Sequence, residues 1–244
     1  MRIDILTLFP EMMETYLNES VVGRARAKGL FEIFCHNIRD YTQDKHRRVD
    51  DTPYSERQGM LMQAEPIYRC YEAVKGDRDP HVIFVSPAGK PFDQQKAKEL
   101  SEKSDILILC GHYEGVDQRV IDEIVDEEIS LGDFVLTGGE LPALCITDAV
   151  VRLLDGVLSK PDCYMDESHY SGLLEYPQYT RPEVWHGKEI PQILISGHHE
   201  NIRRWRHEQS LIKTYEKRPD MIKRLELSEQ DKKLLEEYRA KKVE

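Results

Sequence analysis

Two short apolar runs stand out in the middle of the chain. Ile106–Cys110 and Asp133–Leu136 each lead into glycines with almost no polar residue between. Apolar runs that lack polar alternation are typical of strands in a parallel sheet covered on both faces. Glycine after such strands lets the backbone approach a ligand at the carboxyl ends, where open α/β sheets bind small molecules. The pattern therefore predicts a small-molecule site at Gly111, Gly115, Gly138 and Gly139.

Strand-like and helix-like patterns alternate before residue 155. Besides the two apolar runs, we expect strands at Met1–Phe9, Leu30–Ile38 and His81–Val85, the last ended by a turn at 86–89. The helices expected from apolar periodicity are Glu11–Leu17, Ser20–Lys28, Asp93–Ser101, Asp117–Ile124 and Leu141–Leu154. We expect the apolar side of the last helix to consist of Leu141, Leu144, Cys145, Ala149 and Leu153.

The pattern changes after the last of these helices. Residues 155–181 contain Gly, Pro, Ser and Tyr without sustained periodicity, and the pattern is helical again from Ser196 onward. Loops this long inside compact proteins are usually functional or mobile. Strand–helix alternation followed by helices alone predicts an α/β domain and a small α domain. We place the domains at residues 1–158 and 181–244, joined by a flexible linker at 159–180.

Composition points to a globular protein of the reducing cytoplasm. The 244 residues are 40% hydrophobic and 32% charged, and no apolar run approaches the roughly 20 residues that span a membrane. The N-terminal segment is too short and too alternating for a signal peptide. The cysteines, at 35, 70, 110, 145 and 163, include no CxxC pair. We therefore expect buried thiols, a cytoplasmic location and no membrane contact.

The net charge of −11 is unevenly distributed. Residues 99–140 carry twelve acids and two bases, whereas residues 201–224 carry eight bases and three acids. Phosphate binding depends on local potential, because charges are screened over about 8–10 Å in physiological salt. The basic segment can therefore bind RNA, although a solvated helix face with mixed charges is the alternative. Its bases are Arg203, Arg204, Arg206, Lys213, Lys217, Arg218, Lys223 and Arg224.

Several familiar site patterns are missing from the sequence. No GxGxxG opens a helix, and no GxxxxGK[ST] phosphate loop occurs. No HExxH or Cys/His spacing indicates zinc, so we expect no metal-ligating residues. The side chains that could carry chemistry are the acids Asp166, Glu167 and Glu175 and the helical Arg152, whose alternative role is an ion pair with Asp148 or Asp155. Arg181–Trp185 and Asn201–Arg206 combine bases with an aromatic residue, which suits RNA with an unstacked base, although core packing of Trp185 and Trp205 is the alternative.

Three long motifs carry a family resemblance. They are CGHYEGVDQRV at 110–120, SLGDFVLTGGELPA at 130–143 and GLLEYPQYTRPEVW at 172–185. With these motifs in this order, the chain resembles the bacterial tRNA (guanine-N1)-methyltransferases nearly from end to end. That family belongs to the knotted SPOUT class of S-adenosylmethionine-dependent methyltransferases.

The resemblance implies an α/β fold of the SPOUT type. It implies a parallel sheet with a trefoil knot at the C-terminal end of that domain, followed by a small all-α domain that binds tRNA. The implied reaction is methyl transfer from S-adenosylmethionine to N1 of the guanine at position 37 of tRNA, when another guanine precedes it. The family also implies a homodimer whose active sites are shared between subunits, and its use of magnesium adds Mg²⁺ as a second ligand to consider.

The resemblance also assigns residues. Methylation at N1 requires loss of the ring proton, and a positioned carboxylate can accept it, for a gain of about 10²–10⁴-fold. The family's catalytic carboxylate is usually an Asp eight residues before the acid of a GLL[DE] motif. That acid is Glu175 here, so Glu167 takes the catalytic role, with its neighbour Asp166 as rival. Arg152 matches the arginine that stabilises negative charge on guanine O6.

The implied cofactor pocket consists mainly of glycine-rich loops that read the adenosyl group through the backbone. Glu114, in the first motif, is expected near the cofactor or the target base. The complete set is Phe84, Val85, Ser86, Pro87, Gly111, Glu114, Leu131, Gly132, Asp133, Phe134, Val135, Leu136, Gly138 and Gly139.

One segment departs from the family pattern. Where the family has three glycines before x-GM, this chain has Ser55, Glu56 and Arg57. Side chains here, one of them acidic, would hold a phosphate backbone further away than glycine does. Two alternatives follow: a SPOUT enzyme for another RNA position, or a non-catalytic RNA-binding relative.

Overall fold

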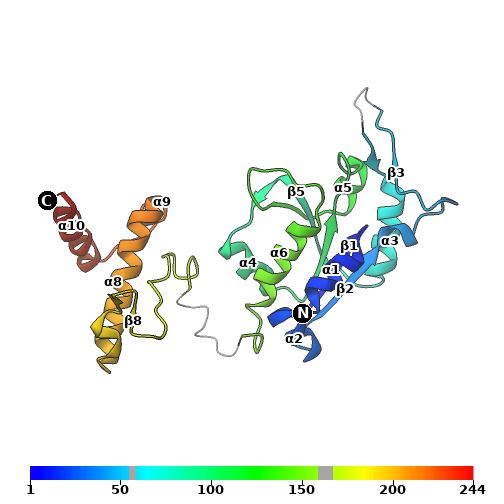
Figure 1. Cartoon of the computed structure of the whole chain (residues 1–244). Helices are drawn as coiled ribbons and strands as arrows, with labels where there is room; N and C mark the ends of the chain where they lie inside the picture. Colours follow the sequence, from blue (N-terminus) through cyan, green and yellow to red (C-terminus); the bar gives the residue numbers. More distant parts are fainter. Residues whose placement is uncertain (55–58, 159–166, 244) are drawn as a thin grey trace. The chain divides into compact units, whose positions relative to one another are not determined.

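The computed structural model describes residues 1–54, 59–158 and 167–243. The chain divides into two compact units, Met1–Pro161 and Asp162–Glu244 (Figure 1). Each unit is described by itself. The predictions that concern Ser55–Arg57, Asp166 and Cys163 lie outside the described residues.

A five-stranded parallel sheet forms the centre of the first unit, as the apolar runs predict. Its strand order is β2-β1-β6-β5-β7, and every neighbouring pair is parallel. The strands are β1 (Arg2–Thr7), β2 (Glu32–Asn37), β5 (His81–Pro91), β6 (Asp105–Cys110) and β7 (Glu127–Ser130).

Helices cover both faces of this sheet (Figure 1). One face, with Ile3 and Ile5 of β1, packs against α1 (Pro10–Leu17), α2 (Ser20–Ala27), α4 (Gln94–Ser101) and α6 (Glu140–Val151). The other face, with Leu6 of β1, packs against α3 (Ala64–Lys75) and α5 (Gln118–Ile124). Each fully buried Ile or Leu contributes about 1.5–3 kcal/mol. A strand buried on both faces needs apolar residues at successive positions, which is why these strands lack polar alternation.

Local signals fix several helix ends where the sequence predicts them. The Asp93 carboxylate accepts a hydrogen bond from the Lys96 N–H at 2.9 Å, and Asp117 accepts one from the Arg119 N–H at 3.0 Å. These side chains satisfy backbone donors that the first turns of α4 and α5 leave unpaired. Gly29 follows α2 with φ +69°, a conformation that glycine adopts without steric cost.

Three predictions about the first unit are wrong. Residues 133–136 form a loop, and Val135 is 82% exposed. The strand of this region is β7, whose acidic start conceals it from an apolar search. The expected turn at 86–89 is an irregularity within β5, because its register with β7 shifts between Val85 and Lys90.

The third error concerns the apolar side of α6. Leu141 and Cys145 are exposed, whereas the buried residues are Glu140, Ala143, Leu144, Ile146, Thr147, Val150 and Val151. The helix is apolar on nearly every side, so periodicity could not identify the side that faces the sheet.

Smaller elements were not predicted. The first unit also contains η1 (Ile38–Asp40) and an antiparallel pair of β3 (Asp50–Asp51) and β4 (Leu61–Met62). Helix α3 was missed as well, although its strong amphipathic pattern buries Ile67, Cys70 and Val74.

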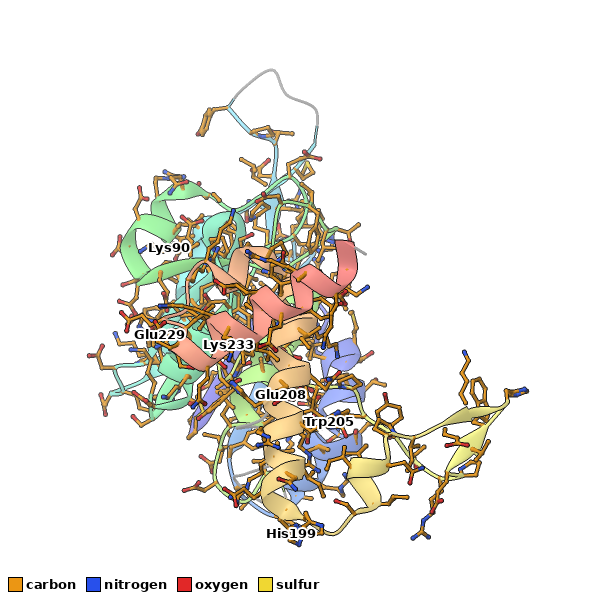
Figure 2. The ribbon with its side chains drawn as sticks, turned by 90° about the vertical axis from the view of Figure 1, so that its left-hand side faces the viewer. Lys90, His199, Trp205, Glu208, Glu229 and Lys233 are labelled. Atoms are coloured by element: carbon orange, nitrogen blue, oxygen red, sulfur yellow. The ribbon has the colours of Figure 1, made fainter. Side chains whose placement is uncertain are left out.

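The second unit is mainly helical, but the expected all-α description needs correction. It contains an antiparallel pair, β8 (Val184–Trp185) and β9 (Lys188–Glu189). Its helices are η2 (Gln192–Ile195), α8 (His199–Lys217), α9 (Pro219–Ile222) and α10 (Glu229–Val243). Figure 2 shows His199 at the beginning of α8. Helix α10, which carries Glu229 and Lys233, crosses α8 and contacts it.

Part of the predicted linker packs on α8. The Leu174 N–H donates to Thr214 Oγ1 at 2.8 Å, and Lys213 Nζ donates to the Glu175 carbonyl at 2.8 Å. Thr214 is fully buried. Residues 174 and 175 are therefore held by α8 within the second unit. No helix in the described parts of the chain is both long and apolar enough to cross a membrane.

Candidate functional site

A cavity of about 270 Å³ lies at the carboxyl ends of β5, β6 and β7. Three loops surround it: the residues that follow Val85, those that follow Cys110, and the segment 131–139. The last two loops are joined by a hydrogen bond from the Gly139 N–H to the Gly111 carbonyl at 2.8 Å. The sheet therefore opens a ligand site at the edge where parallel α/β sheets usually do.

Glycine is required where these loops meet. A Cβ on Gly139 would lie 2.6 Å from Val85 Cγ2 and 2.8 Å from Cys110 Cα. A Cβ on Gly111 would lie 3.1 Å from the Phe84 ring. The Cys110 backbone cannot move away from a Cβ at residue 139, so glycine is required there, whereas a Cβ at residue 111 would need the Phe84 ring to shift slightly.

The structure brings almost all of the predicted cofactor residues together. Every one of them except the exposed Asp133 lines this cavity. The sequence did not single out other lining residues, among them His112, Tyr113, Thr137 and Pro142. They lie inside the quoted motifs, so a search for lining side chains as well as glycines would have found them.

A buried carboxylate stands at the start of α6, directly after the loop 131–139 that lines the cavity. Glu140, the first residue of α6, is 4% exposed and accepts a hydrogen bond from Thr7 Oγ1 at 2.8 Å. The Phe9 N–H donates to the same hydroxyl at 2.9 Å. A carboxylate at a helix N-terminus is stabilised by the helix dipole. This contact fixes the start of α6 to the end of β1.

His112 lies between this carboxylate and the cavity. Its Nδ1 is buried, lies 3.9 Å from Glu140 Oε2, and has no hydrogen-bond partner among the described residues. The Phe9 and Tyr113 rings each lie 5.0 Å from the His112 ring, measured between centroids. A lining imidazole with one unpaired nitrogen is a polar group that a ligand can satisfy.

Glu114 is the one carboxylate among the lining residues. Its side chain is exposed, and its N–H donates to the Met60 carbonyl at 3.1 Å. A Cβ on Gly59 would lie 2.3 Å from Glu114 Cγ, so Gly59 also packs against this side chain. Gly59 and Met60 therefore form part of the surroundings of Glu114.

Arg152 lies at the opposite end of α6 from the cavity. It is the half-buried C-cap residue, whereas Gly139 is the N-cap. The twelve residues between them span about 18 Å at 1.5 Å per residue. Arg152 therefore does not lie beside the cavity of the same chain.

The neighbouring turn of α6 is tied to α1. The Tyr16 hydroxyl donates a hydrogen bond to the Asp148 carboxylate. This bond, followed by burial, raises the pKa of Tyr16 to about 12. The contact holds α1 against the part of α6 that precedes Arg152.

Glu167 belongs to the second unit. It is half-buried, and its carbonyl accepts a hydrogen bond from the Tyr170 N–H at 3.3 Å. The next residue, Ser168, accepts a hydrogen bond at Oγ from the Glu175 N–H at 2.9 Å. This bond connects the two ends of the segment 168–175, and Glu167 directly precedes that segment.

The aromatic and basic residues of the second unit meet beside α8. Tyr179 and Trp205 have ring centroids 6.5 Å apart, and the Arg206 guanidinium lies 4.8 Å from the centre of the Tyr176 ring. Trp205 is half-buried, as core packing expects, but Trp185 of β8 is 61% exposed. Trp185 is therefore not a core residue of this unit.

Comparisons with known proteins show the family of this chain. A profile of the family described as tRNA (Guanine-1)-methyltransferase TrmD matches residues 1–224. The chain belongs to this family. A tRNA (guanine-N(1)-)-methyltransferase of Clostridium botulinum is 53% identical over 241 residues, covering 99% of this chain and 100% of the relative.

More distant comparisons give the same result. A relative of the same name from Ruminiclostridium cellulolyticum is 52% identical over 227 residues, covering 92% of this chain and 97% of its own. The crystal structure of a tRNA (m1G37) methyltransferase from Aquifex aeolicus is similar, with a TM-score of 0.75 and 41% identity. The similarity covers 92% of this chain and 95% of that one. Membership of the tRNA (guanine-1)-methyltransferase family makes the chain an enzyme and implies S-adenosylmethionine as its methyl donor.

The cavity fits such a donor. Two glycine-rich loops expose backbone amides and carbonyls, which can read an adenine ring without charged side chains. The unpaired His112 Nδ1 and the Glu114 carboxylate add polar groups that suit the amino acid part of the cofactor.

Neither metals nor thiols provide a further centre in the described parts of the chain. No three His, Cys, Asp or Glu side chains there are grouped so as to hold a metal ion. Burial raises the pKa of Cys110 well above its usual range and that of Cys35 to about 12, so both thiols stay protonated. Cys145 is exposed, which corrects the expectation that it is buried.

Proposed function

We propose that this member of the family methylates N1 of the guanine at position 37 of tRNA. Transfer to a guanine N1 of tRNA is the activity of the family, and the Aquifex aeolicus neighbour is named for m1G37. The observation that carries the proposal is the cavity between the 111–115 and 131–139 loops. When bound there, S-adenosylmethionine supplies an electrophilic methyl group.

The chain's own task is to position the guanine and remove its proton. Glu167 accepts the N1 proton, since a carboxylate in hydrogen-bond reach contributes about 10²–10⁴-fold. Arg152 donates to O6, where negative charge accumulates as N1 loses its proton. The match of Glu167 and Arg152 to the family motifs supports both roles. The loops around the cavity exclude water from the methyl group.

Two subunits together form each active site. The distance along α6 supports this arrangement, because Arg152 and the cavity of one subunit lie at opposite ends of a twelve-residue helix. A second copy of the chain can bring its Arg152 to that cavity. An exposed apolar surface, made by α1, α6 and the 134–136 loop, is available to such a partner. Its residues are Phe9, Met12, Tyr16, Phe134, Val135, Leu136 and Leu141.

The chain path around the cavity supports a trefoil knot. Helix α5 packs on one face of the sheet and α6 on the other, and Gly138, in the segment that joins them, pairs with His112. The basic helices of the second unit bind the tRNA backbone, and the enzyme works in the cytoplasm. The family's use of magnesium supports Mg²⁺ as a further ligand of the enzyme.

Methylation of tRNA transcripts from labelled S-adenosylmethionine tests this function. We expect transfer to a transcript with guanines at positions 36 and 37, mapped to N1 of the second. A transcript with adenine at position 37 should accept no methyl group. Equal transfer to both transcripts would assign the enzyme to another RNA position. No transfer to either, with cofactor bound normally, would favour the non-catalytic RNA-binding alternative.

A further inference from the structure

The second unit contains a cavity of its own. It measures about 530 Å³ and is formed entirely by residues 176–206. Its volume falls within the roughly 300–1,000 Å³ of ordinary small-molecule clefts. The residues that matter below are Tyr176, Tyr179, Arg181, Glu183, Ile202 and Arg206.

The lining of this cavity combines aromatic, aliphatic, polar and charged side chains, and it includes one buried donor without a partner among the described residues. Arg206 Nε is buried and has no hydrogen-bond partner among the described residues. The same guanidinium stacks on the Tyr176 ring at 4.8 Å, which holds its plane in place. A buried donor without an acceptor is unfavourable, so a ligand that brings an acceptor gains from filling the cavity.

A second aromatic ring is open at this site. Tyr179 lines the cavity and is 48% exposed. The centres of the Tyr179 and Trp205 rings lie 6.5 Å apart. Figure 2 shows Trp205 on one side of α8, and the segment that contains β8 and β9 extends from the same side. A flat ring that is supported behind and open in front is a stacking platform for a nucleobase.

The charged residues of the lining favour a base over a phosphate as the occupant of the cavity. Glu183 lines the cavity together with Arg181 and Arg206, so the lining offers an acceptor as well as donors, and the edge of a base can use both. Outside the cavity, Arg203 and Arg204 are exposed on α8, where they can hold phosphates. The arrangement is that of a base pocket with a basic rim.

We propose that this cavity binds one unstacked base of the tRNA substrate, other than the guanine that is methylated. The base stacks on Tyr179, and its ring nitrogen or carbonyl oxygen accepts a hydrogen bond from Arg206 Nε. The proposal rests on the proposed function, since it takes tRNA as the ligand. It gives the second unit a role in recognising the loop as well as its phosphates.

Abasic tRNAs test the base pocket. We would measure the affinity of the enzyme for transcripts that lack one base at each anticodon-loop position in turn, at one salt concentration. The wild-type enzyme should bind one of them, abasic at a position other than 37, about 10-fold more weakly than intact tRNA. Tyr179→Ala should bind intact tRNA about 10-fold more weakly and lose the difference at that position. Tyr179→Phe keeps the ring and should behave as the wild type.

Two further variants separate the pocket from its rim. Arg206→Gln should also reduce the difference at that one position, whereas Arg204→Ala should weaken binding to every transcript by the same factor. Equal effects of Tyr179→Ala on all transcripts, or no effect, would overturn the base pocket. Equally tight binding of free nucleoside monophosphates, with no abasic position affected, would overturn it too. Methylation of intact tRNA by the wild-type enzyme is scored separately, so failure of the proposed function remains distinguishable.

Discussion

The cavity at the ends of the sheet strands and the cavity beside α8 are built by opposite means. The cavity of the first unit is formed by glycine loops at the ends of parallel strands, and its shape depends on the absence of side chains at Gly111 and Gly139. The cavity of the second unit is formed by side chains that stack beside one helix, such as Arg206 on Tyr176. A backbone-lined site is rigid and suits one small molecule, whereas a site of aromatic and basic side chains suits RNA.

The largest expected effect concerns the chemical step and not binding in either cavity. Glu167→Gln keeps the size of the side chain but cannot accept the N1 proton. We expect the methylation rate constant under single-turnover conditions to fall about 10²–10⁴-fold, with the affinities for cofactor and tRNA unchanged. Glu189→Gln, an exposed substitution on β9, is the matched control and should retain full activity. Near-normal turnover of Glu167→Gln would mean that Asp166 or a water molecule, and not Glu167, accepts the N1 proton.

A smaller effect tests whether stability and function separate. Asp4 is fully buried in β1, lines neither cavity, and is paired with Arg2, His36 and Arg78. Asp4→Asn should lower the free energy of unfolding by about 2 kcal/mol, because the buried amide cannot replace all the hydrogen bonds that the Asp4 carboxylate accepts from the partly exposed Arg2 and Arg78. Asp220→Asn removes an exposed ion pair with Arg218 and should change the free energy of unfolding little, because solvent screens the pair. Urea unfolding followed by circular dichroism measures both, and similar values would make the Asp4 network unimportant.

The same network makes the stability of the fold depend on pH in the acidic range. Burial raises the pKa of Asp4, but hydrogen bonds from His36 and Arg2 outweigh burial and hold the pKa at about 2. The unfolded chain has a carboxyl pKa of about 3.9. Because the folded pKa is lower, this contribution is complete above the unfolded pKa and is lost as the pH falls towards about 2. Asp4→Asn should therefore flatten the acid side of the stability curve, and an unchanged curve would contradict the assignment.

The smallest expected effect is a partial recovery of methylation activity when two inactive variants are mixed. Ser86→Tyr fills the first cavity, and Arg152→Ala removes the charge at the other end of α6. If each site combines the cavity of one subunit with Arg152 of its partner, the mixed dimer contains one intact site. Mixing inactive parents should then restore up to about a quarter of wild-type activity. Verified subunit exchange without recovery would place both groups in one subunit's site.

The sequence was most informative where one physical signal dominates. Apolar runs predicted β1 and β6, and glycine spacing predicted the loops around the first cavity. The same signal misled at 133–136, because apolar residues that serve a loop or a partner surface resemble a strand. Helix α6 was predicted, but its uniformly apolar composition concealed which side is buried.

Contacts between distant residues could not be predicted. Thr7 and Glu140 are 133 positions apart, and only the folded sheet brings the hydroxyl to the carboxylate. The second cavity depends in the same way on Tyr176 meeting Arg206 across a loop that has no periodic pattern. The catalytic residues were assigned from motif similarity alone, so their roles stay predictions.

Titration of S-adenosylmethionine into the wild-type enzyme and Ser86→Tyr tests the central claim most directly. Ser86 is half-buried and lines the first cavity, so the added ring occupies the space that the cofactor needs. Calorimetry should show at least about a 100-fold loss of cofactor affinity, since burial of the ligand's apolar surface is lost. Ser86→Ala should bind the cofactor normally, and both variants should bind tRNA as the wild type does. Unchanged cofactor affinity in a folded Ser86→Tyr enzyme would contradict the account and place the methyl donor elsewhere.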